Sequence, residues 1–144
     1  MKKQTIELLA PAGSWEALEA AVNAGADAVY MGGKAFGARQ YASNFDREEM
    51  QKAVYFAHMH RVRLYITVNT LVDDSELGEL VDYLLFLSNV GIDGIIVQDL
   101  GVIRLARQIV PDLPLHASTQ MTVTNSEGVK LAAEAGMELS LIHI

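Results

Sequence analysis

The chain has 144 residues, of which 51% are apolar and 20% are charged, and its formal net charge is −7. This composition is typical of one globular domain and excludes a disordered segment, and no apolar run reaches the roughly 18 residues of a membrane-spanning helix. The absence of cysteine excludes disulfides and thiolate-bound metals within the chain, and the acidic balance excludes a broad basic surface for nucleic acid.

Short apolar runs alternate with stretches of helical period along the chain. The runs are rich in Val, Ile, Leu and Tyr and are apolar at successive positions, which predicts strands covered on both faces. The predicted strands are residues 6–11, 27–32, 63–69, 93–99 and 115–119, with a sixth at 138–144.

Helix signals fill the intervals between these strands. Asp46 with Glu49, and Asp73 with Glu76, have the spacing of a capping box, and Asn125 is expected to begin the last helix. The predicted helix ends are Gly25, Gly91 and Gly136. The first helix is expected to bury Trp15, Leu18, Ala21 and Val22, and the third to bury Leu77, Leu80, Val81, Leu84 and Leu85.

One local pattern recurs where a helix leads into a strand: Gly25-Ala26-Asp27, Gly91-Ile92-Asp93 and Gly136-Met137-Glu138. Strictly alternating strands and helices predict an α/β fold with a parallel sheet and right-handed crossovers. A doubly wound sheet and a partial (β/α)8 barrel both fit. The turn after the first strand lacks a glycine-rich phosphate loop, which favours the TIM-like barrel. A whole barrel needs about 250 residues, so we expect residues 1–144 to be a truncated N-terminal barrel domain of about five and a half βα units.

Polar residues follow several of the predicted strands, at the edge where both folds bind ligands. The candidates are Pro11, Gly13, Ser14, Gly32, Gly33, Arg39, Tyr41, Asn44, Asn69, Gln98, Asp99, His116, Ser118, Thr119 and Gln120.

Several of these candidates also have a purely structural interpretation. Ser14 and Asp99 have the position of helix N-caps, and Asn69 suits its own turn. His116 fits a buried core position, and the pair 32–33 fits a turn with positive φ. Each alternative stays open from the sequence alone.

The loop after the second strand is about twice as long as the 2–6 residues usual between a strand and a helix. Long loops at this edge commonly carry function, and the guanidinium of Arg39 suits a carboxylate or a phosphate. No Gly-x-Ser-x-Gly, His-Glu-x-x-His or cysteine nucleophile is present, so no peptidase machinery is recognisable.

The ordered motifs "ELLAPAG", "AGADAVYMGG", "FGAR…NF", "VNT", "QDLG" and "HASTQ…N" resemble the N-terminal part of peptidase family U32, over residues 6 to about 137. This family includes collagenase-like proteins and tRNA and rRNA hydroxylation proteins. The motif positions are Glu7, Pro11, Gly13, Asp27, Tyr30, Gly32, Arg39, Asn44, Asn69, Asp99, His116, Ser118, Gln120 and Asn125.

The resemblance implies a TIM-like N-terminal domain and, for full-length members, oxygen-independent hydroxylation of RNA pyrimidines or a quinone precursor. It also implies an iron–sulfur cluster held by cysteines further along the chain, and dependence on prephenate in some members. This chain departs from the pattern because it has no cysteine and because residues 138–144 do not match the expected strand. We therefore expect a truncated chain with a non-native tail, inactive by itself, with no cofactor of its own.

Three functions remain open: the N-terminal part of an RNA-hydroxylating protein, a U32-type protease, and a non-catalytic module for a small anionic ligand such as prephenate. No catalytic residue or metal ligand is assigned. The predicted substrate-binding residues are Arg39, Asn44, Asn69, Asp99, His116, Ser118 and Gln120. We expect a cytoplasmic chain without membrane contact, which self-associates and meets RNA only within the full-length protein.

Overall fold

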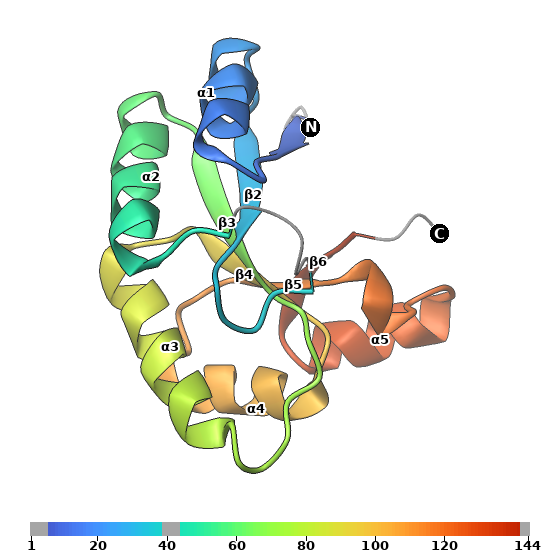
Figure 1. Cartoon of the computed structure of the whole chain (residues 1–144). Coiled ribbons are helices and arrows are strands. Elements are labelled where there is room, and N and C mark those ends of the chain that lie inside the picture. Colours follow the sequence, from blue (N-terminus) through green and yellow to red (C-terminus); the bar gives the residue numbers. More distant parts are fainter. Residues whose placement is uncertain (1–5, 39–43, 142–144) are drawn as a thin grey trace.

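The computed structural model describes residues 6–38 and 44–141 and consists of one parallel sheet with helices between its strands (Figure 1). Neighbouring strands follow the order of the chain, from β1 to β6. The strands are β1 (Leu9–Pro11), β2 (Ala28–Gly32), β3 (Arg63–Val68), β4 (Gly94–Val97), β5 (Leu115–Ala117) and β6 (Met137–Ser140). The helices are α1 (Trp15–Asn23), α2 (Arg47–Met59), α3 (Leu77–Val90), α4 (Leu100–Ile109), the short 3-10 helix η1 (Thr119–Met121) and α5 (Ser126–Glu134).

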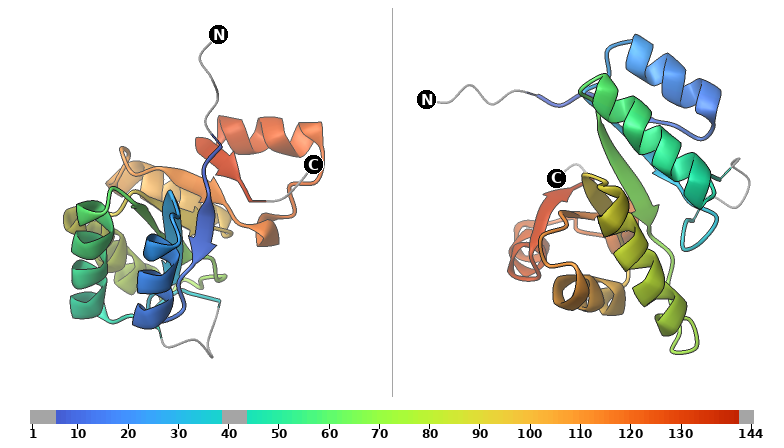
Figure 2. Two further views of the ribbon diagram at one scale, coloured as in Figure 1. Left: turned by 90° about the horizontal axis from the view of Figure 1, so that it is seen from above. Right: turned by 90° about the vertical axis from the view of Figure 1, so that its left-hand side faces the viewer.

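The helices follow one another around the outside of a curled sheet, which confirms the partial TIM-like barrel (Figures 1 and 2). Successive strand residues point to opposite faces of the sheet. Val29 and Ile66 belong to the large core that lies under the helices. Ala28, Tyr65 and Ile96 form a second cluster on the concave face, which corresponds to the interior of a barrel.

The strands β1 and β6 are the lateral edges of the sheet in the described part of the chain. Leu8 beside β1 exposes 57% of its surface, and Leu139 in β6 exposes 42%. Unpaired strand edges and exposed apolar side chains favour association. Self-association stays a prediction, which sedimentation velocity of the purified chain will check. A single sharp monomer boundary would contradict it.

The Gly-x-Asp repeat acts at the amino ends of the strands. The backbone N–H of Asp27 donates to the Leu8 carbonyl at 2.9 Å, and its carboxylate accepts the Leu8 N–H at 2.8 Å. Asp93 makes the same pair of bonds with Leu64, at 2.9 and 2.8 Å. Each aspartate therefore fastens the start of its strand to the preceding strand.

Most predicted helix boundaries are confirmed. Ser14 and Asn125 are N-caps whose side chains accept backbone N–H groups of the first turn. Asp46 and Glu49 form the complete capping box, with bonds of 2.9 and 2.8 Å. The predicted helix-ending glycines, at positions 25, 91 and 136, all have the left-handed backbone that reverses a chain after a helix.

The second predicted capping box is wrong. The N-cap of α3 is Glu76, and its side chain makes no capping bond. The Asp73 carboxylate instead accepts the N–H and the hydroxyl of Ser75, and these bonds lower the pKa of Asp73. The Asp73 N–H donates to Glu76 at 3.0 Å. The pair thus closes a turn just before the helix.

All six predicted strands need new boundaries, and β4, predicted at 93–99, is limited to Gly94–Val97. The strand predicted from residue 6 begins at Leu9, and the strand predicted at 115–119 ends at Ala117 because η1 follows. The sixth strand is Met137–Ser140, paired in parallel with β5 and with a register shift between Leu115 and His116. Residues 142–144 lie outside the described residues, and the proposed non-native tail stays a prediction.

Two side chains expected in the core lie largely at the surface. Trp15 exposes 37% and Leu85 41%. The Trp15 indole N–H donates to Glu19 at 3.0 Å instead of entering the core. In α3, Tyr83 and Leu87 are buried in the place expected for Leu85. This helix is apolar around most of its circumference, so only its contact with the sheet selects the buried stripe.

The long connection between β2 and α2 has both ends pinned to the sheet. Gly33 and Phe45 form an isolated parallel bridge. The Lys34 N–H donates to the Phe45 carbonyl at 3.2 Å, and the Phe45 N–H donates to the Gly32 carbonyl at 3.1 Å. Phe45 is buried and anchors the return of the chain into α2, as predicted.

The structural alternative of a positive-φ turn at Gly32 and Gly33 is wrong, since neither adopts a left-handed backbone. These glycines instead allow a close approach. A Cβ atom at Gly33 would overlap the Tyr83 hydroxyl. At Gly32 it would lie 3.1 Å from Asn44 Oδ1 and 3.3 Å from Thr67 Oγ1. The bare backbone therefore leaves room for side chains that come from α3, from β3 and from the loop.

Candidate functional site

A hollow of about 470 Å³ opens at the carboxyl ends of the strands, on the concave side of the sheet. This size is within the usual range for small-molecule sites. We call it the mouth cavity, and the described residues that line it are Leu9, Tyr30, Ala38, Thr67, Asn69, Ile96, Ser118, Thr119, Gln120 and Leu141. None of these side chains is charged. The cavity thus combines aromatic and aliphatic surface with neutral hydrogen-bonding groups.

The walls of the mouth cavity follow from the alternation of the strands. Thr67 and Ile96 are partners in the β3–β4 register and both face the concave side. Leu9 and Tyr30 pack against the same concave cluster from β1 and β2. Parallel strands bring all of these side chains to one end of the sheet, although they come from four different segments of the chain.

The β2–α2 loop reaches the rim of the mouth cavity. Its Ala38 N–H donates to Asn69 Oδ1 at 3.0 Å, so Asn69 holds the loop at the end of β3. Asn44 lies close to Thr67, because both side chains approach the same point next to the Gly32 backbone. Arg39 lies outside the described residues, and its predicted contact with a ligand stays a prediction.

Residues after β5 form the opposite rim. Ser118 is buried, and its hydroxyl accepts the Gln120 N–H at 3.3 Å as the N-cap of η1. The Gln120 side chain is exposed and has no hydrogen-bond partner within the described ranges. Its amide can therefore donate to and accept from a ligand in the cavity.

Asp99 has a structural role away from this group. One carboxylate oxygen accepts the N–H groups of Gly101 at 2.7 Å and Val102 at 3.0 Å, which caps α4. The other accepts the Val72 N–H at 3.4 Å. Asp99 is absent from the lining of the mouth cavity. The capping interpretation is therefore the one that its contacts support.

His116 lies in the concave face beside Ile96, its register partner in β4. It exposes 6% of its surface, and its Nδ1 atom has no hydrogen-bond partner in the described part of the chain. Burial lowers the pKa of His116, although the carboxylates of Glu138 and Glu7 oppose this shift. The ring is therefore neutral at pH 7, as expected for a buried position.

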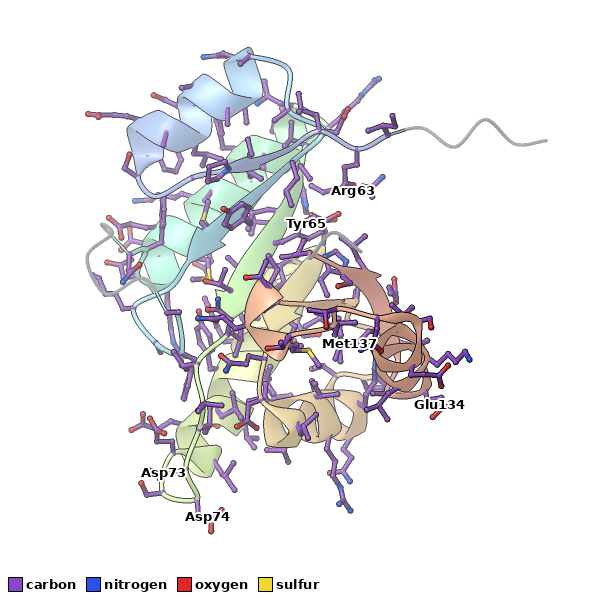
Figure 3. The ribbon with its side chains drawn as sticks, turned by 90° about the vertical axis from the view of Figure 1, so that its right-hand side faces the viewer. Arg63, Tyr65, Asp73, Asp74, Glu134 and Met137 are labelled. Carbon is purple, nitrogen blue, oxygen red and sulfur yellow. The ribbon has the colours of Figure 1, made fainter. Side chains whose placement is uncertain are left out.

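A second polar group lies on the concave face toward the amino ends of the strands. Glu7 accepts from Arg63 at 2.6 Å and from the Tyr65 hydroxyl at 3.1 Å. Tyr65 and His116 meet edge to face, with ring centroids 4.6 Å apart. Gly94 makes this contact feasible, since a Cβ atom there would lie 3.3 Å from the Tyr65 ring. Figure 3 shows Arg63 and Tyr65 along β3, far from the loop tip with Asp73 and Asp74 that follows the strand.

The mouth cavity is suited to binding and orienting a neutral planar group. Its described lining contains no carboxylate, imidazole or amine that could transfer a proton. Within residues 6–38 and 44–141, no three His, Asp or Glu side chains gather in a way that could hold a metal. The described helices are also too short or too polar to span a membrane.

Of the seven predicted substrate-binding residues, the structure brings Asn69, Ser118 and Gln120 into one cavity, with Asn44 close by. Thr67 and Tyr30 lie inside strands and are therefore not strand-end candidates, although Tyr30 is one of the motif positions. The signal that reveals them is alternation: counting back by two from Asn69 reaches Thr67, on the same face.

Comparison with known proteins supports one family. The sequence profile of peptidase family U32 matches residues 13–140. The chain is 39% identical over 132 residues to tRNA hydroxylation protein P1 of Bacillus subtilis (strain 168), covering 92% of this chain and 31% of that protein. It is 38% identical over 131 residues to the 23S rRNA 5-hydroxycytidine C2501 synthase of Escherichia coli (strain K12), covering 91% of this chain and 19% of that protein.

Among solved structures, the U32 peptidase Mk0906 superposes with a TM-score of 0.75 at 14% identity, covering 97% of this chain and 60% of that one. This likeness concerns the fold alone. The chain spans less than a third of the length of the two curated relatives. Both the profile match and the identities support the same conclusion: the chain belongs to peptidase family U32.

Proposed function

We propose that this chain is the N-terminal barrel part of a protein that hydroxylates a pyrimidine in tRNA or rRNA, and that the mouth cavity binds the pyrimidine base. The two relatives named for tRNA hydroxylation and for 5-hydroxycytidine synthesis support the reaction class. The observation that carries the binding role is the uncharged lining of the mouth cavity, which contains an aromatic ring and several amide and hydroxyl groups.

A single base taken out of its stack needs this kind of site. RNA-binding proteins stack unpaired bases on aromatic rings and read their edges with hydrogen bonds. Enzymes that modify a base enclose it in a close-fitting pocket for the same reason. Tyr30 provides a ring at the cavity wall, and the amides of Asn69 and Gln120 can read the polar edge of a pyrimidine.

The charge of the chain limits what it does with RNA. A net charge of −7 repels a phosphate backbone, so affinity for the RNA chain must come from other parts of the full-length protein. An anionic ligand such as prephenate is a weaker alternative for the same cavity. It would need Arg39, because the described lining offers no cation.

The iron–sulfur cluster implied for full-length family members does not fit the residues of this chain. The sequence has no cysteine, and no metal-binding group of His, Asp and Glu exists in the described part. The contribution of this chain to the reaction is therefore to hold and orient the base and to exclude water around it.

A protease function is suggested by relatives named as an uncharacterized protease and as a collagenase, but the described side chains do not support it. Ser118 uses its hydroxyl to cap η1, and within the described residues no hydrogen bond joins it to the His116 ring. A hydroxyl nucleophile needs a base within hydrogen-bond reach to lose its proton. Ser118 and His116 therefore do not form a nucleophile and base pair.

Nucleoside analysis of cellular RNA tests the proposal. In the source organism, deleting the gene should remove a hydroxylated pyrimidine from the tRNA or rRNA fraction, measured by mass spectrometry. The intact gene should restore it, and a gene carrying Gln120→Ala should restore only roughly a tenth to a half, since the base loses a hydrogen-bonding partner. Tyr55→Phe, at an exposed position on α2, is the matched control and should restore it fully.

Unchanged hydroxylated pyrimidines in both RNA fractions after deletion would overturn the proposed reaction. Full restoration by Gln120→Ala together with Tyr30→Ala would leave the reaction intact but overturn the role of the mouth cavity.

A further inference from the structure

The backbone of the β2–α2 loop fixes the hydrogen-bonding polarity of one side chain in the mouth cavity, Asn69. This residue directly follows β3 and lines the cavity together with Ala38. A carboxamide has an oxygen that only accepts hydrogen bonds and a nitrogen that only donates them. The Ala38 N–H donates to Asn69 Oδ1 at 3.0 Å. Because a backbone N–H can only donate, the amide oxygen must face the loop, and the amide nitrogen must face away from it.

The amide nitrogen of Asn69 keeps two N–H donors. Within residues 6–38 and 44–141, the bond from Ala38 is the hydrogen bond that this side chain makes, and it engages the oxygen. Asn69 is half-buried. A polar group that is partly removed from water and has no protein partner is one that a ligand can satisfy. The bond to the oxygen also polarises the amide and strengthens its N–H donors.

Other polar side chains of the mouth cavity adapt to a ligand. The Gln120 side chain is exposed and unpartnered within the described ranges, so its amide can turn either end toward the cavity. The Thr67 hydroxyl lies 3.4 Å from the Met31 carbonyl, and the Ser118 hydroxyl accepts the Gln120 N–H at 3.3 Å. Hydroxyl groups both donate and accept, so neither excludes one kind of ligand group. The fixed donor of Asn69 is therefore the group that discriminates.

A fixed donor distinguishes the two kinds of substituent found on the edge of a pyrimidine ring. An oxo group accepts a hydrogen bond, whereas an amino group donates one. An amino group against the Asn69 nitrogen would leave two donors facing each other without an acceptor, which is unfavourable in a site that excludes water. An oxo group in the same place would satisfy the donor.

From this arrangement we infer that Asn69 is a specificity-determining residue of the mouth cavity: its amide nitrogen donates to a carbonyl oxygen of the bound ring and selects an oxo substituent over an amino substituent at that position. The oxygen of the same amide holds the β2–α2 loop beside the ligand, since Ala38 also lines the cavity. The inference rests on the proposed binding of a base in this cavity. Its test uses neither RNA nor the hydroxylation reaction, so the two proposals can fail separately.

Two small rings, 1-methyl-2-pyridone and N-methylaniline, are suitable probes because both are flat, neutral and similar in size. The first has one oxo group and no N–H, and the second has one N–H and no oxo group. Each is titrated into the isotope-labelled 144-residue chain and followed by nuclear magnetic resonance. The amide signals of Ala38 and Asn69 should move with the pyridone. The pyridone should bind roughly two- to tenfold more tightly than N-methylaniline, which corresponds to one hydrogen bond.

The variant Asn69→Asp separates the two roles of the side chain. Aspartate has nearly the same shape and keeps an oxygen for the Ala38 N–H, but it replaces the two N–H donors by a second acceptor. The preference for the pyridone should disappear or reverse, while the hydrogen-exchange rate of the Ala38 amide should stay as in the wild type. Asn23→Asp makes the same change of charge at the exposed last residue of α1 and should alter neither measurement.

Equal binding of the two rings to the wild type would overturn the inference, and so would the absence of signal changes with both. A pyridone preference retained in Asn69→Asp or in Asn69→Ala would overturn it as well, because Asn69 would then only hold the loop. If the expected preferences are observed but deletion of the gene leaves the hydroxylated pyrimidines of cellular RNA unchanged, the selectivity of Asn69 stands and only the proposed reaction is wrong.

Discussion

The two ends of the same parallel sheet contrast in how their polar groups are used. At the amino end, Asp27 and Asp93 bind the backbone of Leu8 and Leu64 within 2.9 Å, and the Asp93 carboxylate also contacts the His58 ring at 2.8 Å. At the carboxyl end, the amide of Gln120 is open to a ligand in the mouth cavity. In (β/α) folds the residues that stabilise the sheet and the residues that bind ligands commonly lie at opposite ends of the strands. The binding residues can then be substituted without loss of stability. We therefore expect substitutions at the amino end to affect mainly stability and those at the carboxyl end to affect mainly the proposed binding.

The largest effect in this comparison is expected for Asp93→Ala. Leu64 is fully buried, so losing the carboxylate leaves its N–H without an acceptor, and the His58 ring, 2.8 Å from the same carboxylate, loses its partner as well. The free energy of unfolding should fall by about 2 kcal/mol, measured by urea denaturation. Asp74→Ala, in the exposed loop after β3, is the control and should change little. A loss below about 0.5 kcal/mol, smaller than one hydrogen bond, would contradict the fastening role of Asp93.

A smaller effect is expected for Asp27→Ala, which removes the same type of bond in the first repeat. Leu8 exposes 57% of its surface, so water can replace the lost carboxylate. The expected loss is about 1 kcal/mol or less, in the same urea experiment. If Asp27→Ala destabilises the chain more than Asp93→Ala, burial does not determine how much the Asp27–Leu8 and Asp93–Leu64 hydrogen bonds contribute to stability.

At the carboxyl end, Asn69→Ala should affect binding more than stability. The lost bond to the Ala38 N–H is exposed, so the unfolding free energy should fall by only about 0.5 kcal/mol. The hydroxylated pyrimidine should nevertheless decline in complemented cells, because the loop is no longer held at the rim. A decrease of more than about 2 kcal/mol in the unfolding free energy, the scale of a buried unsatisfied group, would show that Asn69 mainly stabilises the fold.

The smallest expected effect is a pH dependence from His116. Its pKa is lowered by burial in the folded chain, so the unfolded chain binds a proton more readily below pH 6.5. Stability should therefore decrease as the pH falls through 6.5, where the unfolded imidazole becomes charged. Thermal unfolding of the wild type and of His116→Gln at pH 7.5 and 5.5 checks this. The variant should show the smaller decrease, and equal decreases would exclude His116 as the cause.

Much of the fold was predictable because its signals are local. The capping box of Asp46 and Glu49 is set by residues three apart, and the left-handed glycine after α3 by its missing Cβ. The site was predictable where a polar residue directly follows a strand, as Asn69 and Ser118 do. Tyr30 and Thr67 lie within strands. The sequence does not distinguish a strand residue that lines the cavity from one that packs in the barrel interior.

The sequence by itself determined the alternation of strands and helices, their caps and their order, because each depends on residues a few positions apart. Only the tertiary structure decided which apolar residues are buried: α3 is apolar around most of its circumference, and its contact with the sheet buries Tyr83 and exposes Leu85. The tertiary structure also explains why position 33 is a glycine. The Tyr83 hydroxyl, fifty positions further along the chain, occupies the space that a Cβ atom would need. Such contacts depend on how the helices dock on the sheet, and no short-range pattern encodes them.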